Sequence, residues 1–98
     1  MNYNFEWDSR KAGLNFRKHK ISFEDAATVF KDPRSISLYD SEHSSDDERW
    51  ITLGIGGNGA LIVVVHTFEE QDEHNCKIRI ISARKATKKE TKQYKINT

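Results

Sequence analysis

The sequence of 98 residues predicts a single α+β domain, in which N-terminal helices lie on one face of an antiparallel sheet. Apolar residues recur at helical spacing in the first third of the chain, whereas residues 35–83 alternate or run apolar in the manner of strands. A capping box close to the end predicts one more helix. The expected order is a strand, two helices, a four-stranded antiparallel meander and a C-terminal helix, and residues 1–98 leave little room for a second core.

The N-terminal third contains one predicted strand and two predicted helices. Residues 3–7 alternate aromatic and polar side chains, as a strand does. Asp8 is a suitable N-cap for a helix over residues 9–18, whose basic last turn suits the negative end of the helix dipole. Ser22 and Asp25 resemble a capping box, and four apolar residues then share one helical face. These four are Phe23, Ala26, Ala27 and Phe30, and Asp32-Pro33 ends the helix.

The remaining strands are expected at residues 35–39, 50–55, 60–67 and 77–83, separated by acidic loops at 40–48 and 69–75 and by a glycine-rich turn at 56–59. The third run is almost continuously apolar, which predicts a strand covered on both faces and paired with residues 77–83. Alternation in the last strand places Ile78 and Ile80 on one face and Arg79, Ile81 and Ala83 on the other. Thr87 and Glu90 form the capping box of a helix from Lys88 to about Lys95.

Composition excludes several classes of protein. The longest apolar run, residues 60–65, is too short to cross a bilayer, and no signal peptide opens the chain. Cys76 is the single cysteine, so we expect no internal disulfide and a reducing, cytoplasmic location. No membrane partner is predicted.

The net charge of +1 conceals a strong separation of charge along the chain. Residues 40–76 carry one basic side chain against nine acidic ones, whereas residues 77–98 carry eight basic side chains against one acidic. This basic tail can attract a polyanion or dock on an acidic protein surface. The alternative is that the two segments neutralise each other within the fold.

Four stretches of the sequence together resemble one family. FEWD-x2-KA-x2-N covers residues 5–15, KH-x-I-x-FE-x-A-x2-VF-x-DP covers 18–33, HSSDDER covers 43–49, and RIISARKAT-x2-E covers 79–90. Their order and combination resemble the BrnT family, the toxins of bacterial type II toxin–antitoxin pairs. Three departures from the family's usual pattern are Lys20 in place of Gly, His66 in place of Tyr, and the lack of an Arg two residues after Thr67.

The resemblance implies a RelE-like fold and an endoribonuclease that cleaves RNA without a metal ion, inhibits translation and needs no cofactor. It also implies a hetero-oligomer with a cognate, BrnA-like antitoxin, which neutralises the toxin and carries the DNA-binding half of the complex. DNA would then be contacted only through the antitoxin. Two alternatives stay open, namely a catalytically inactive binding module that acts in DNA-binding autoregulation, and a ribosome-dependent mRNase.

Metal-independent RNA cleavage needs a base for the 2′-hydroxyl, cations for the pentavalent phosphorane and an acid for the leaving oxygen. Arg79 and Arg84 are the candidate cations, because guanidinium binds phosphate bidentately and stays charged. They reach one phosphate only if the strand twists or ends near Ser82. The alternative for Arg79 is a salt bridge to a buried acid such as Glu24 or Asp40.

Histidines are the candidates for proton transfer. His19 is expected at a helix C-terminus, and His43 lies near Asp46, Asp47 and Glu48, so both settings favour the charged ring. Their alternative roles are helix capping and loop anchoring. The spacing of the loop lets His43 and Arg49 fold back toward the sheet.

Three other aromatic or imidazole side chains have a structural reading beside a functional one. Tyr94 could donate a proton or stack on a base, but it could equally dock the last helix. His66 is expected to be a hydrogen-bonded core residue and His74 a solvated one.

A basic surface is predicted beside these groups and could track an RNA backbone, which adds affinity without sequence choice. The alternative is a merely solvated face. The candidate RNA-binding residues are Lys18, Ser82, Lys85, Lys88, Lys89 and Lys92. No metal site is predicted, because the acidic and imidazole groups of residues 66–76 match no standard zinc spacing.

Overall fold

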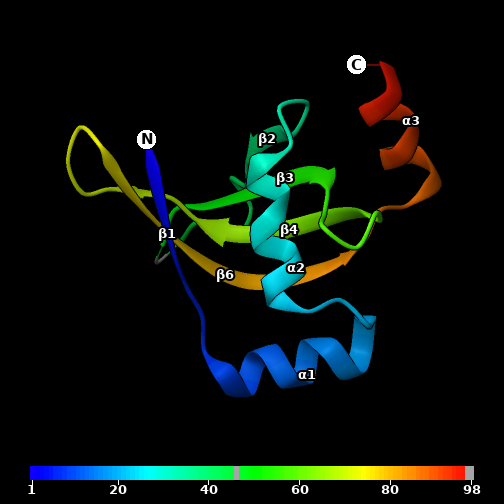
Figure 1. The fold of residues 1–98 in the computed structure, drawn as a ribbon, viewed down its shortest axis with the longest axis horizontal. Coiled ribbons are helices and arrows are strands. Elements are labelled where there is room, and N and C mark those ends of the chain that lie inside the picture. The colour runs from blue at the N-terminus through cyan, green and yellow to red at the C-terminus, as the bar shows by residue number, and fades with distance from the viewer. Residues whose placement is uncertain (46, 97–98) are drawn as a thin grey trace.

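The computed structural model describes residues 1–45 and 47–96, and over these residues the chain folds as α+β, with three α-helices and a six-stranded sheet (Figure 1). None of the helices in the described part of the chain is long and apolar enough to cross a membrane. The elements, in chain order, are β1 (Asn2–Glu6), α1 (Ser9–His19), α2 (Phe23–Thr28), the 3₁₀ turn η1 (Val29–Lys31), β2 (Ile36–Tyr39), β3 (Arg49–Ile55), β4 (Leu61–Thr67), β5 (Glu69–Glu70), β6 (Asn75–Lys85) and α3 (Lys88–Ile96).

The sheet is mixed, with its strands in the order β1-β6-β4-β3-β2. The pairs β2–β3, β3–β4 and β4–β6 are antiparallel, as the sequence predicts. β1 pairs in parallel with β6, and this long-range pairing left no signal in the sequence. The predicted acidic loop at residues 69–75 is partly wrong, because Glu69 and Glu70 form the short strand β5 against β6.

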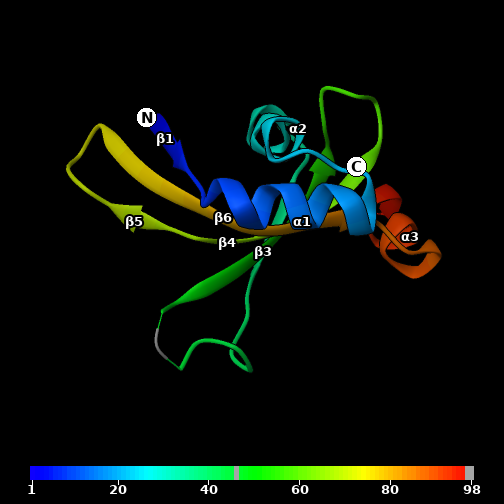
Figure 2. The same ribbon diagram turned by 90° about the horizontal axis from the view of Figure 1, so that it is seen from below.

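The two N-terminal helices cover one face of the sheet, as predicted, and Figure 2 shows α1 and α2 on the same side of β6. Phe23, Ala26 and Val29 share a buried core with apolar side chains of β4 and β6, among them Ile62 and Ile78. A second, smaller core lies on the opposite face, where α3 packs Tyr94 against Leu53 of β3 and Val63 of β4. The near-continuous apolar run in β4 is therefore covered on both faces, as expected.

A β-bulge interrupts β6 and changes which side chains share a face. Val65 of β4 pairs with Ser82, but the next residue, His66, pairs with Ile80, so that Ile81 is the extra residue. Ala83 consequently joins Ile78 and Ile80 in the core beneath the helices. The predicted alternation, which placed Ala83 on the face opposite Ile80, is wrong for this reason.

Local hydrogen bonds confirm the predicted starts of the helices. The carboxylate of Asp8 accepts hydrogen bonds from the backbone N–H groups of Arg10 and Lys11, at 2.9 and 3.1 Å. The hydroxyl of Ser22 accepts from the N–H of Asp25 at 3.0 Å. Each cap satisfies backbone donors that have no partner within the helix.

The end of α1 depends on a lysine in a backbone conformation that usually belongs to glycine. Lys20 has φ 61° and ψ 25°, and its N–H donates to the carbonyl oxygen of Phe16 at 2.8 Å. The left-handed stop is thus present although Lys20 has replaced the usual Gly. An L-residue with a Cβ pays about 1 kcal/mol for this conformation.

Replacing Lys20 by glycine should therefore stabilise the protein, by about 0.5–1 kcal/mol, because the left-handed strain disappears. Urea unfolding followed by far-UV circular dichroism measures the change. The matched control is Lys18→Gly, the same replacement inside the same helix, which should destabilise by about 1 kcal/mol. A loss of stability in Lys20→Gly would show that the lysine conformation carries no strain.

Candidate functional site

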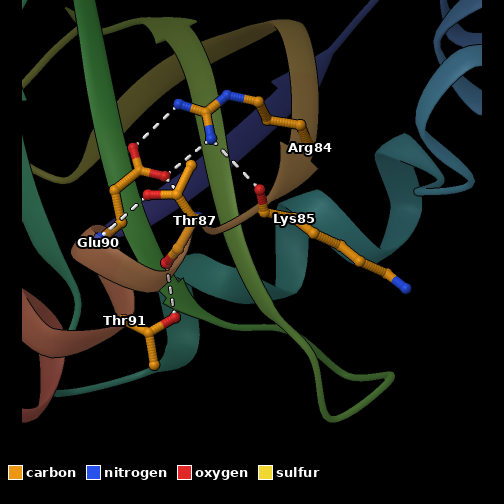
Figure 3. A network of polar contacts seen from close by, with 5 residues as sticks. All are labelled: Arg84, Lys85, Thr87, Glu90 and Thr91. Atoms are coloured by element: carbon orange, nitrogen blue, oxygen red, sulfur yellow. Dashed lines mark hydrogen bonds and ion pairs between the residues drawn. The ribbon is translucent and has the colours of Figure 1, made fainter.

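Arg84 lies in a tight network at the start of α3, which Figure 3 shows in detail. Its guanidinium donates two hydrogen bonds to the carboxylate of Glu90, at 2.8 and 2.9 Å. Glu90 also accepts from the N–H of Thr87, whose hydroxyl accepts in return from the N–H of Glu90, so the predicted capping box is complete. The hydrogen bonds from Arg84 are the main cause that lowers the pKa of Glu90 to about 2. Arg84 thus holds α3 to the sheet.

Arg79 has a carboxylate partner of a different kind. Its guanidinium donates to Asp47 at 2.8 Å, and the two side chains are 45% and 49% exposed. The alternative of an ion pair is therefore found, but the partner is an exposed loop residue and not the predicted Glu24 or Asp40. An ion pair this exposed stabilises a fold by at most about 1 kcal/mol, so a phosphate can compete with Asp47 for the arginine.

The two arginines of β6 do not converge. Because of the bulge, both follow the face opposite the core of α1 and α2, where Arg84 is paired in register with Val63. They are five residues apart along a strand that continues to Lys85, which separates their Cα atoms by about 15 Å. Each is held by its own carboxylate, so they do not form a single phosphate site.

Arg49 is a better-placed partner for Arg79. It pairs in register with Thr67 of β4, and the hydroxyl of Thr67 accepts a hydrogen bond from the backbone N–H of Arg79 at 3.2 Å. The two arginines thus flank β4 on one face, with Cα atoms about 10 Å apart, within reach of one phosphate for two long side chains. Nε of Arg49 is buried and has no hydrogen-bond partner among the described residues. Arg49 therefore keeps one donor that no described residue satisfies.

The loop before β3 brings an imidazole to the same end of the sheet. Nδ1 of His43 lies 3.0 Å from Oδ2 of Asp40, and the ring is 65% exposed. An ionised carboxylate only accepts, so Nδ1 carries a proton in this pair, and in the neutral form of the ring Nε2 is an acceptor. Ser44 closes the loop, since its hydroxyl donates to the carbonyl of Asp40 and accepts from the N–H of Arg49. Asp46, one of the acids predicted near His43, lies outside the described residues.

A second group of predicted residues meets at the end of α1. Lys18 and His19 line a hollow of about 280 Å³ together with Ser82 of β6. His19 lies in the last turn of α1, as predicted. The remaining members of the predicted basic surface are all exposed and lie on or just before α3: Lys85, Lys88, Lys89 and Lys92.

Tyr94 anchors α3 from its buried side. Its ring packs in the smaller core and its hydroxyl donates to Oδ2 of Asp32 at 2.5 Å. This hydrogen bond is the main cause that raises the pKa of Tyr94. Burial opposes ionisation of Asp32, yet hydrogen bonds from the N–H of Ile55, from Tyr94 and from the N–H of Arg34 leave its pKa below the usual value. These contacts agree with the alternative role for Tyr94, in which its side chain docks the last helix on the sheet.

Sequence reasoning missed a buried chain of hydroxyl groups that leads to His66. The ring is 2% exposed and lies edge-on to Phe30, with its Nδ1 2.9 Å from the carbonyl oxygen of Thr67 and its Nε2 2.6 Å from the hydroxyl of Thr52. Ser37 lies 2.8 Å further on, between Thr52 and a cavity of about 300 Å³. Burial is the main cause that lowers the pKa of His66. The expectation of a hydrogen-bonded core histidine is confirmed.

Side chains that could ligate a metal ion do not cluster in the described part of the chain. Among residues 1–45 and 47–96, no three side chains of His, Cys, Asp or Glu gather in a geometry that could hold a metal ion. His74 is exposed and pairs only weakly with the neighbouring Glu73 at 3.3 Å, which agrees with a solvated role.

The described geometry, with guanidinium and imidazole groups at one end of a small sheet and a basic final helix, is typical of proteins that bind phosphodiesters. The family model described as "Ribonuclease toxin, BrnT, of type II toxin-antitoxin system" matches residues 7–90 of the chain. The chain therefore belongs to the BrnT family of ribonuclease toxins, and such a toxin has an antitoxin partner. No curated protein matches the sequence.

Arg84→Ala should lower the free energy of unfolding by about 2 kcal/mol, because it removes a bidentate, charge-assisted pair and leaves Glu90 without its partner. Urea unfolding at pH 7 measures the change. Arg79→Ala is the matched control on the same strand and should cost at most about 1 kcal/mol. Equal losses in the two variants would contradict the distinction between a structural and an available arginine.

His66 should make stability depend on pH. Because its pKa in the folded state lies below the reference value of 6.5, the unfolded chain binds the proton first as the pH falls. This contribution is fully present above about pH 6.5 and decreases progressively below it. Urea unfolding between pH 7.5 and pH 5.5 measures the slope, which should flatten in His66→Gln and persist in the exposed control His74→Gln. Identical slopes in wild type and His66→Gln would refute this origin.

Proposed function

We propose that this BrnT-family chain is an endoribonuclease toxin that cleaves RNA without a metal ion, with the scissile phosphate held between Arg49 and Arg79. The observation that carries the proposal is the placement of these two guanidinium groups on either side of Thr67, on one face of the sheet. One of them has a buried donor without a described partner, and the other is held only by an exposed acid. Arg79 can thus exchange its exposed partner for an anion, and Arg49 has a donor that no described residue satisfies.

In this mechanism the arginines stabilise the negative charge that accumulates on the pentavalent phosphorane. His43 in its neutral form acts as the base toward the 2′-hydroxyl through Nε2, while Asp40 orients the ring through Nδ1. The departing 5′-oxygen takes its proton from water. Arg84 and Tyr94, both candidates from the sequence, are positioning residues in this proposal. Their polar groups are engaged with Glu90 and Asp32, and they fix α3 against the sheet.

The basic surface is proposed to bind the RNA backbone away from the cleaved bond. Lys18, His19 and Ser82 offer cationic and hydroxyl groups around one hollow, and exposed lysines continue on α3. Contacts of this kind give an affinity for RNA that decreases as the salt concentration rises. They give no sequence preference. A RelE-like fold, which the resemblance implies, is part of this proposal.

The partner proposed for the chain is a cognate antitoxin that carries the DNA-binding half of the complex. Eight basic side chains against one acidic over residues 77–98 favour an acidic partner that covers the RNA-binding surface and so blocks the substrate. Contact with DNA would then pass through the antitoxin.

Purified wild-type protein should cleave single-stranded RNA in the presence of EDTA, and Arg79→Ala and Arg49→Ala should each lower kcat/KM by about a hundredfold or more, since each removes a charge from the transition state. Asp47→Asn should raise kcat/KM, because it releases Arg79 from its competing partner. Denaturing gel electrophoresis of end-labelled RNA measures the rates.

The matched control is Lys77→Ala, another exposed cation of β6 that pairs with Glu6 and should leave cleavage nearly unchanged. Intact RNA after incubation with folded wild type would leave the second candidate, an inactive binding module that represses with its antitoxin. Cleavage that appears only on translated message would instead assign the ribosome-dependent activity.

A further inference from the structure

We propose that the cavity between η1, β2 and the end of β4 binds one nucleobase of the RNA, so that the toxin contacts a base as well as the phosphate. The inference rests on the proposed ribonuclease function and adds a subsite on the opposite face of the sheet from Arg49. The cavity has a volume of about 300 Å³, at the lower end of the range of small-molecule sites.

Aromatic rings from separate parts of the chain form the walls of this cavity. The rings that line it belong to Tyr3, Phe30, Trp50 and Phe68. The ring centroid of Tyr3 lies 6.1 Å from that of Phe30 and 6.4 Å from that of Phe68. Tyr3 is 41% exposed and Phe68 36%, so large apolar rings remain open to solvent at the rim. Rings of this kind are the usual stacking partners of unpaired RNA bases.

Serine hydroxyls and His66 supply the polar part of the lining, and hydrogen bonding fixes their direction. Nδ1 of His66 must donate to the carbonyl of Thr67, which leaves Nε2 to accept from the hydroxyl of Thr52. Thr52 has then used its only proton, so Ser37 donates to Thr52. Ser37, which is exposed at the cavity, therefore presents lone pairs to a ligand. It selects a ligand that donates a hydrogen bond, as the amino and imino groups on the edges of bases do.

The described residues that line the cavity carry no charge, and this favours a base over a phosphate as the ligand. The residues that line the cavity are aromatic side chains, Ser35, Ser37 and His66, and burial keeps that imidazole neutral. A phosphate placed there would lose its hydration without gaining a cation. A flat, uncharged base with donor groups on its edge loses little hydration on entering the cavity. It gains stacking contacts with the aromatic rings.

The cavity lies next to the proposed phosphate site along the chain. In β4 and just beyond it, His66 faces the cavity, Thr67 faces Arg49 and Arg79, and Phe68 lines the cavity again. A larger hollow continues on the other side of Tyr3 and Phe30 and contains Lys31 and Asn75. It offers a polar path for the nucleotide chain that leaves the base site.

The test is a titration of the ¹⁵N-labelled protein with uncharged nucleosides (adenosine, guanosine, cytidine and uridine), followed by ¹H–¹⁵N NMR. We expect shifts at Ser37, Phe68 and the indole N–H of Trp50. Ribose 5-phosphate, which lacks a base, should leave these signals in place. Ser37→Leu, which fills the cavity, and Phe68→Ala, which removes a stacking ring, should weaken nucleoside binding by about tenfold or more. Phe16→Ala removes a ring on α1 that is more exposed than Phe68, at 50% against 36%, and should bind as wild type does.

The outcomes distinguish this inference from the proposed function. Nucleoside shifts that are absent from the cavity, or that persist in both Ser37→Leu and Phe68→Ala, would overturn the base site whether or not the protein cleaves RNA. Shifts confined to the cavity in a protein that leaves RNA intact would support the base site and reject the nuclease. In a cleaving wild type, Ser37→Leu should raise KM about tenfold and leave the EDTA resistance unchanged.

Discussion

The β-bulge at Ile81 is the constraint on which the arrangement of charges depends. The extra residue brings Ala83 into the core beneath α1 and α2, so the residue after it turns to the opposite face. Arg84 thereby reaches Glu90 and closes the capping network of α3. Without the bulge, strict alternation would point Arg84 toward the helices, where a guanidinium has no partner and a high cost of burial.

The two arginines of β6 show how burial and geometry separate structural from functional charge. Arg84 makes a bidentate contact with a carboxylate that is only 24% exposed and that also caps a helix. Arg79 makes one contact with a carboxylate that is half-exposed on a loop. Replacing the carboxylate partner by another anion costs much free energy at Arg84 and little at Arg79. The Arg79 pair is therefore the one that the proposed phosphate can displace, and Arg49 lies across β4 from it.

Local features of the fold could be predicted from the sequence because their causes are local. The caps at Asp8, Ser22 and Thr87 depend on side chains within three residues of the atoms they satisfy, and all three are present. The antiparallel strands follow from apolar patterns of period two. The bulge, the parallel pairing of β1 with β6 and the partner Asp47 depend on contacts between residues far apart in the sequence, which no local pattern encodes.

The candidate site likewise contains residues that the sequence indicated and residues that it did not indicate. Residue type alone made Arg79, Arg49 and His43 candidates, as it did Arg84 and His19, since guanidinium and imidazole groups carry this chemistry wherever they lie. The sequence gives no signal for the hydroxyl chain from Ser37 through Thr52 to His66, because serine and threonine are common in strands. Only the pairing of β2 with β3, and of β3 with β4, aligns these side chains. That alignment gives the two faces of one sheet end opposite characters. Alternation along the end of β4 directs Thr67 toward Arg49 and Arg79 and its neighbours toward a neutral aromatic cavity. The proposed phosphate site and the proposed base site depend on this single alternation.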